Sequence, residues 1–216
     1  MADWVHFCAQ SAKPRFSLMQ ASLYQHFNRL VPITEAEFAP LAEALTTRTL
    51  RKKEPLLQPG EECRHISFVE RGLLRSFTTD AKGHEVVDQF APEGWWLADL
   101  YSFLTHEPAT YAIDALEATQ VLQLTQQQTQ LLLDTMPKFE RYFRLLMQNN
   151  YIATHRRLTL ALGRTAEEKY EALLASTPGI MQRVPQYLVA SYLGITPEFL
   201  SRMRSRRAKV RPTPNQ

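Results

Sequence analysis

Residues Ala190–Arg207, with the sequence ASYLGITPEFLSRMRSRR, contain the pattern that decides the fold. A helix is predicted to start at Val184-Pro185 and to run through Tyr192. Gly194 follows it and suits a turn, because glycine adopts the left-handed conformation that often ends a helix. The arginines that follow the turn indicate a second helix with a basic face.

The second helix has a recognisable start. The Thr196 hydroxyl can accept a hydrogen bond from a backbone N–H of the first turn, which makes Thr196 a good N-cap. Pro197 suits the first helical position, and Glu198 suits the positive end of the helix dipole. Two helices separated by about three residues are typical of a helix-turn-helix motif, whose second helix enters the major groove of DNA.

Apolar residues are spaced so that they face the crossing of the two helices. Ala190 is small enough to let the helices approach closely, and Leu200 and Met203 point inward from the second helix. The opposite face of that helix is therefore expected to be exposed to solvent. The alternative to a helix-turn-helix is a helical hairpin that caps a core. The apolar positions at the crossing are Val189, Leu193, Ile195, Leu200 and Met203.

The outward face of the second helix carries side chains that suit DNA. Arg202 can donate two hydrogen bonds to guanine, and Glu198 can accept one from the amino group of cytosine. Contacts to phosphates add affinity but no sequence specificity. The outward residues are Glu198, Ser201, Arg202 and Ser205, and the predicted phosphate contacts are Thr196, Arg204, Arg206 and Arg207.

The basic charge of the chain is concentrated at its end. The formal net charge is +3, but residues 199–216 hold six basic residues and no acidic one, so the rest of the chain carries −3. This asymmetry indicates a polyanionic partner. Nucleic acid is favoured over a membrane, because no apolar face accompanies the basic run beyond Met203; a solvated tail is the alternative. The six residues are Arg202, Arg204, Arg206, Arg207, Lys209 and Arg211.

Length and composition are those of a globular cytoplasmic protein. The 216 residues are 44% apolar, without a run of the roughly 18 apolar residues that a membrane span needs and without the features of a secretory signal. Cys8 and Cys63 belong to no metal-binding pair and are predicted to be free thiols, since a reducing compartment disfavours a disulfide. Met1 and Met19 both remain candidate starts, and residues 1–18 show no clear period.

Evenly spaced glycines predict a β domain over residues 48–125. Gly60, Gly72, Gly83 and Gly94 lie 12, 11 and 11 residues apart, a spacing typical of the strands and turns of an antiparallel sandwich or barrel. The segments between and after them resemble strands: HISFVE, LLRSFTT, EVVDQFA, TYAIDALEA and TQVLQLT.

Helices are predicted on both sides of this domain. Thr34 and Glu37 match a capping box, followed by Phe38, Leu41 and Leu45 at helical spacing. Further helices are expected over 19–30, 125–136 and 164–178.

One long helix is predicted between Pro137 and Gly163, about 40 Å in length at 1.5 Å per residue. A stripe along it is of the kind that pairs two helices, and Asn150 within the stripe could fix their register. Packing of the stripe against the chain's own sheet is the alternative, and the two can coexist on different faces. The stripe consists of Phe139, Phe143, Leu146, Asn150, Thr154, Leu158 and Ala161.

The whole order of elements resembles the Crp/Fnr superfamily of bacterial transcription regulators. The resemblance covers nearly all of residues 20–210 and lies in LLQPGEECRHISFVERGLLRSF, GWWLADLYSFLTHEPATYAIDALEAT and GITPEFLSRM. It implies an α+β fold: an N-terminal β-roll of the cyclic-nucleotide-binding type (jelly roll) with flanking helices over 19–136, a connecting and dimerisation helix over 137–163, and a C-terminal helix-turn-helix domain over 164–216. The family's base-contacting Glu and Arg correspond to Glu198 and Arg202.

The sequence departs from the members that bind cyclic AMP. They carry a Gly-Glu pair that holds the ribose and an Arg ten residues after that Glu, and here these places are Ala98-Asp99 and Ala109. A buried phosphate without a cation would be costly, so cyclic AMP is predicted not to be the effector. Asp99 could still bond a hydroxyl and Arg75 could supply charge, or both could be ordinary surface residues. The candidate pocket consists of Arg75, Trp96, Asp99, Leu100, Ala109 and Thr110.

Trp95-Trp96 and Phe103 could line a site for an apolar ligand or belong to the core. The chain also departs from the family at its end, where the residues after the recognition helix are too few for a β-hairpin wing, so a full wing is not expected.

An enzyme is the rival class, but no cofactor, metal site or catalytic activity is predicted. His65, His84 and Glu85 lack the close His-x-His pair of a cupin metal site, and no Ser-His-Asp order, P-loop or dinucleotide motif is visible. The partners implied by the resemblance are duplex DNA, a second copy of the chain, RNA polymerase and an unknown small-molecule effector, without a membrane. A ligand-sensing or protein-interaction module without DNA binding is the other alternative.

Overall fold

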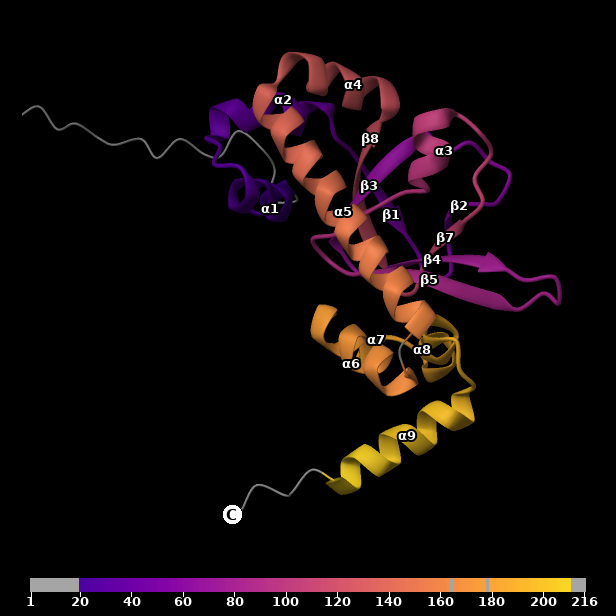
Figure 1. The fold of residues 1–216 in the computed structure, drawn as a ribbon. Coiled ribbons are helices and arrows are strands. Elements are labelled where there is room, and N and C mark those ends of the chain that lie inside the picture. Colours follow the sequence, from indigo (N-terminus) through magenta and orange to yellow (C-terminus); the bar gives the residue numbers. More distant parts are fainter. Residues whose placement is uncertain (1–19, 164, 178, 211–216) are drawn as a thin grey trace, which may run out of the picture.

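The computed structural model describes residues 20–163, 165–177 and 179–210, except for the side chains of 160–162 and 207–210 (Figure 1). The predictions on Cys8, Met19 and Arg211, on residues 1–18 and on the wing lie outside these ranges, as do the side chains of Ala161, Arg207 and Lys209.

A β domain is followed by a helical C-terminal part. The elements are α1 (Ala21–Leu30), α2 (Glu35–Ala44), β1 (Thr46–Leu50), β2 (Pro55–Leu57), β3 (His65–Arg71), β4 (Leu74–Thr79), β5 (Glu85–Ala91), β6 (Trp96–Leu97), α3 (Leu100–Thr105), β7 (Ala112–Ala115), β8 (Thr119–Thr125), α4 (Gln126–Thr135), α5 (Pro137–Gly163), α6 (Ala166–Ser176), α7 (Ile180–Arg183), α8 (Gln186–Leu193) and α9 (Pro197–Val210).

Two antiparallel sheets of four strands form the β domain, in the orders β1-β8-β3-β6 and β2-β7-β4-β5. Alternate side chains of these strands point between the sheets, as in a sandwich or roll. The fully buried Leu50, Phe68, Leu74 and Leu122 belong to this core. The predicted α+β class with an N-terminal β-roll is confirmed.

The four predicted turn glycines all have positive φ angles. Gly72 is the most constrained of them, with φ at +99°. A Cβ atom added there would lie 2.5 Å from the Thr119 Oγ1 and 2.6 Å from the Thr119 Cα. The close approach of Thr119 therefore requires glycine between β3 and β4.

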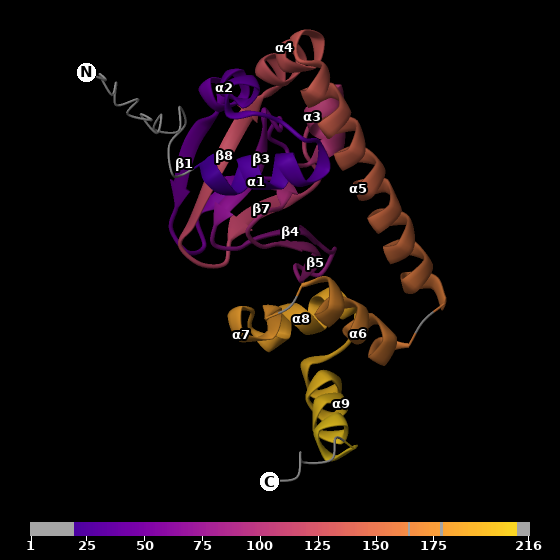
Figure 2. The same ribbon diagram turned by 90° about the vertical axis from the view of Figure 1, so that its left-hand side faces the viewer.

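Helices α1 and α2 cover one side of the roll together with the first half of α5 (Figure 2). The predicted capping box of α2 is present, with the Thr34 N–H donating to the Glu37 carboxylate at 2.9 Å. The Tyr142 ring of α5 is fully buried and stacks on Phe27 of α1 with 4.2 Å between centroids. The Tyr142 hydroxyl also lies 2.7 Å from His26 Nδ1 and accepts a hydrogen bond from Trp96 Nε1 at 2.9 Å. This network joins α1, β6 and α5.

A second hydrophobic core lies under the hairpin of β4 and β5. Leu73, Val87 and Phe90 of the β domain pack there with the buried apolar residues of α6–α9. Figures 1 and 2 both place α8 directly beneath this hairpin and α9 at the far end of the molecule. The helix-turn-helix segment therefore rests on the sheet rather than hanging from α5 alone.

Candidate functional site

The helix-turn-helix predicted from the opening stretch is present in the fold. Gly194 ends α8 with φ at +69°, and the Thr196 hydroxyl accepts the Phe199 N–H at 3.2 Å as the N-cap of α9. Leu200 and Met203 face the buried crossing with Val189 and Leu193, and Ala190 is completely buried between the helices. The sequence therefore located both the turn and the inward face of α9.

The opposite face of α9 is open to solvent. Both candidate base-reading residues, Glu198 and Arg202, are exposed. Arg204 is only half-buried. Arg207 belongs to the helix by its backbone, and its side chain is among those that are not described. The exposed candidates are Thr196, Glu198, Ser201, Arg202, Ser205 and Arg206.

Glu198 is held as an anion at the start of α9. Hydrogen bonds from its own backbone N–H and from Thr196 lower the pKa of its carboxyl, and the charge of Arg202 lowers it further. An ionised carboxylate only accepts hydrogen bonds, whereas the Arg202 guanidinium only donates them. The open face therefore offers one acceptor and one forked donor a single helical turn apart, which suits the edges of base pairs.

Contacts between the helix-turn-helix and the β domain form a docking interface that the sequence did not indicate. The Ser191 hydroxyl of α8 accepts the Val87 N–H at 3.1 Å and donates to the Glu85 carbonyl at 2.7 Å, so it pairs with the open edge of strand β5. Arg183 bridges Glu93 at 2.8 Å and Glu117 at 2.6 Å. Arg157 of α5 donates to the Asp88 carbonyl at 2.7 Å.

The candidate pocket residues do not converge as predicted. Asp99 is buried, but its carboxylate accepts the backbone N–H groups of Ser102, Thr110 and Tyr111 at 3.1, 2.9 and 3.2 Å. It is the N-cap of α3, and its oxygens are committed to the protein rather than to a ligand hydroxyl. Ala109 is buried and exchanges two backbone hydrogen bonds with Gly60 and Glu61.

Arg75 does not supply free charge to a ligand. Its guanidinium donates to Asp114 at 2.7 and 2.8 Å and also pairs with Glu85, while the Phe77 ring lies 4.1 Å away. Burial alone would lower the pKa of Arg75, but the hydrogen bonds to Asp114 and Glu85 raise it above its usual value. Arg75 is buried within β4, so it is neither a surface residue nor an unpaired cation.

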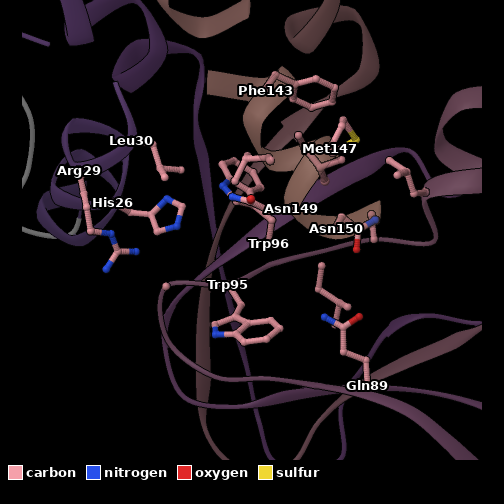
Figure 3. Close-up of a pocket in the computed structure, with 16 residues that line it drawn as sticks. His26, Arg29, Leu30, Gln89, Trp95, Trp96, Phe143, Met147, Asn149 and Asn150 are labelled. Carbon is pink, nitrogen blue, oxygen red and sulfur yellow. The ribbon is translucent and has the colours of Figure 1, made fainter. Parts of the chain in front are cut away.

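A cleft of about 370 Å³ lies instead between α1, α5 and the segment before α3 (Figure 3). Of the predicted pocket residues, Trp96 and Leu100 line it, whereas Arg75, Asp99, Ala109 and Thr110 do not. Its wall combines rings with amide and cationic groups, as Figure 3 shows for His26 and Arg29 on one side and Asn150 on the other. Burial and the charge of Arg29 lower the pKa of His26 to about 4, so its ring is neutral at neutral pH. Phe103 does not line the cleft and belongs to the core.

The stripe on α5 divides into two parts. Phe139 is 1% exposed and packs in the core of its own chain, with Phe143 and Leu146 beside it, so Phe139 cannot meet a second chain. Further along, Asn150, Thr154 and Leu158 are exposed. Large apolar side chains here are also open to solvent, with Tyr151 71%, Ile152 47% and Leu158 57% exposed. The alternative of packing against the chain's own sheet therefore holds for the first half of α5.

Neither a metal cluster nor a membrane span was found within the described ranges. No group of three or more His, Cys, Asp or Glu residues there could hold a metal ion. Among the helices of that part of the chain, none is long and apolar enough to cross a lipid bilayer. Cys63 is a free, buried thiol, and burial raises its pKa.

Comparisons with known proteins agree with this architecture. Residues 47–136 match the model of the cyclic nucleotide-binding domain. The chain is 26% identical over 192 residues to the fumarate and nitrate reduction regulatory protein of Vibrio cholerae serotype O1, covering 82% of this chain and 75% of that protein. It is also 26% identical over 173 residues to the regulatory protein HlyX of Actinobacillus pleuropneumoniae, covering 74% and 70%.

The fold is similar to that of FixK2 from Bradyrhizobium japonicum, with a TM-score of 0.66 at 20% identity, covering 76% of this chain and 85% of that one. The domain match, the two regulatory relatives and the order of β-roll, long helix and helix-turn-helix support one conclusion: the chain contains a cyclic nucleotide-binding domain and is similar in sequence and architecture to transcription regulators of the Crp/Fnr type.

Proposed function

We propose that this protein is a cytoplasmic transcription regulator that binds duplex DNA as a homodimer through α9. The observation that carries the proposal is the open face of α9, on which Glu198 and Arg202 stand exposed while Leu200 and Met203 anchor the helix from behind. An arginine face packed against another part of the chain would favour a module that does not bind DNA. Arg202 and Arg206 are exposed instead.

The experiment is duplex binding by the full chain as a function of salt. Fragments selected from a random duplex pool should bind tightly at about 50 mM salt and lose affinity steeply toward about 200 mM, because phosphate contacts release counterions. Salt-independent or absent binding would contradict the proposal.

A second copy of the chain is expected to pair along the second half of α5. Tyr151, Ile152 and Leu158 are exposed in this helix, and Asn150 lies at the junction with the buried half. Burying such side chains between two helices is favourable by about 25 cal/mol per Å² of apolar area. Light scattering on the wild type and on a Leu158→Glu variant tests this part, since a monomeric wild type would contradict it.

The effector is proposed to be a small molecule other than cyclic AMP. No cation stands at Ala109, and the neighbouring Arg75 is already paired with Asp114 and Glu85. A cyclic phosphate placed there would meet Asp99 without a compensating charge. Equilibrium dialysis of the full chain with cyclic AMP should show no binding, and a dissociation constant in the micromolar range would overturn this proposal. RNA polymerase is a further proposed partner.

The relatives are regulatory proteins, and we propose that the β domain likewise transmits a signal rather than catalysing a reaction. Elemental analysis of the purified protein provides the direct test, because a stoichiometric metal would favour the rival enzyme class.

A further inference from the structure

Phe199 is an aromatic residue on the open side of α9 that does not serve the packing of the helix-turn-helix. Its side chain is 39% exposed, whereas Leu200 and Met203 of the same helix are 0% and 8% exposed. Among the described side chains of α9, which are those of residues 197–206, Phe199 is the large apolar side chain that is exposed to solvent. An exposed phenyl group in the middle of a polar face gains free energy only when something apolar covers it.

The position of Phe199 is fixed by the start of the helix. Its N–H donates to the Thr196 hydroxyl at 3.2 Å, so the residue lies in the capped first turn. The Arg202 guanidinium carbon lies 6.0 Å from the centre of the Phe199 ring, close to the outer limit for a cation–π contact. The ring and the guanidinium therefore stand next to each other, one turn apart, on the half of α9 that faces away from the core.

We propose that Phe199 determines sequence specificity by contacting the C5-methyl group of a thymine next to the base pair that Arg202 reads. This inference rests on the proposed function, because it requires α9 to lie in the major groove. The thymine methyl is the apolar group that the major groove presents, and a phenyl ring has no hydrogen-bonding group with which to read any other base edge. Cytosine at the same place would leave the ring against a polar edge.

The test removes the methyl group and leaves base pairing intact. A duplex selected by the full-length wild-type protein is resynthesised with deoxyuridine in place of each thymidine, one position at a time, and binding is followed by fluorescence anisotropy at one salt concentration. At one thymine in each half-site, affinity should fall about fourfold, the effect of losing one buried methyl group. Every other thymine should tolerate the change.

The Phe199→Ala variant assigns the effect to the ring. It should bind the thymidine and deoxyuridine duplexes equally, while the Phe199→Leu variant should keep part of the difference. Tyr101→Ala is the matched control, because Tyr101 is a 66% exposed aromatic residue on α3 in the β domain. That variant should keep the full wild-type ratio.

Two results would overturn the inference: a wild-type protein indifferent to every substitution, or a Phe199→Ala variant with an unchanged ratio. If the Phe199→Ala variant fails to fold, the deoxyuridine series with the wild type can still refute the inference, and the Phe199→Leu variant then assigns the effect to the ring. If the wild-type chain binds no duplex at all, the proposed function itself fails, and this inference fails with it. A chain that binds duplexes but ignores the methyl group refutes only the role of Phe199.

Discussion

Arg183 and Glu93 form a two-pronged ion pair across the junction of the β domain and the helix-turn-helix, with N–O distances of 2.8 and 2.9 Å. Arg183 lies at the end of α7 and Glu93 in the turn after β5, and Glu117 contacts the same guanidinium at 2.6 Å. Burial alone would raise the pKa of Glu93, but the hydrogen bonds from Arg183 bring it below its usual value. The pair therefore remains charged well into the acidic range and helps to keep α8 against β5.

The Arg183→Ala variant should loosen this docking interface. A partly exposed ion pair contributes about 1 kcal/mol, so the amide of Val87, which donates to Ser191, should exchange with solvent about fivefold faster. Hydrogen exchange resolved at β5 measures this. Arg144→Ala, which removes an exposed pair within α5, is the control and should leave Val87 unchanged. Equal exchange in both variants would mean that Arg183 does not hold the interface.

Arg202→Ala and Arg206→Ala should weaken DNA binding in different ways. The loss of Arg202 should cost about 1–3 kcal/mol on a selected duplex and relax the preference at one base pair of each half-site. The loss of Arg206, which is expected to bind a phosphate, should weaken all duplexes alike and reduce the slope of the salt dependence by about one for each phosphate left unneutralised. Titrations of selected and scrambled duplexes at several salt concentrations separate the two. The assignment is wrong if both variants lose affinity without a change in preference.

The Arg75→Met variant should be destabilised through Asp114. Arg75 is 6% exposed, and its removal leaves the Asp114 carboxylate without its buried partner, at a cost of about 3 kcal/mol in the free energy of unfolding. A double variant, Arg75→Met with Asp114→Leu, should recover part of this loss. Urea denaturation of both proteins provides the measurement. A single variant as stable as the wild type would mean that the pair of Arg75 and Asp114 adds no net stability to the fold.

Acid should destabilise the fold through His26. The folded pKa of about 4 lies below the ordinary value of 6.5, so the unfolded chain binds the proton more readily. Stability is therefore fully present above about pH 6.5 and falls as the pH drops toward 4. After discounting for partial exposure, the loss between about pH 7 and pH 5 should be about 1 kcal/mol.

The His26→Gln variant should remove this part of the pH dependence, measured by thermal unfolding across the same range. His84→Gln is the matched control, because the His84 side chain is 74% exposed. If both variants retain the wild-type slope, another group is responsible.

The Gly72→Ala variant should lower the free energy of unfolding by at least about 2 kcal/mol, since a positive φ and a clash with Thr119 add together. Gly83→Ala tests the first cause alone. Its φ is +83° but nothing lies within 4 Å of the added Cβ atom, so about 1 kcal/mol is expected. Chemical denaturation compares them, and equal losses would show that Thr119 can move aside.

Local patterns made much of the fold predictable. The segments EVVDQFA and TQVLQLT are strands β5 and β8, and the Thr34 capping box starts α2 where expected. Each of these signals lies within a few residues, so it needs no knowledge of distant contacts. The inward and outward faces of α9 were predictable for the same reason.

The candidate pocket was not predictable in this way. Arg75 finds Asp114 on the neighbouring strand, and Asp99 is occupied by the amides of Thr110 and Tyr111, which follow α3. The register of the strands decides which group pairs with a charged side chain, and the sequence alone does not show that register. The short elements β1, β2, β6, α3 and α7 were missed because tertiary contacts, rather than their own periodicity, define them. The helix-turn-helix boundaries were accurate to within about two residues.

Strand β5 is an outer strand of its sheet, and the Ser191 hydroxyl occupies the Val87 N–H and the Glu85 carbonyl on its free side. If α8 moves away from β5, these two main-chain groups lose their hydrogen bonds to Ser191. They must then bond to water or to a strand from another molecule. A rearrangement of the two parts of this protein would therefore expose an edge strand that can pair with another molecule. Ser191 of the helix-turn-helix prevents this pairing as long as α8 stays on β5.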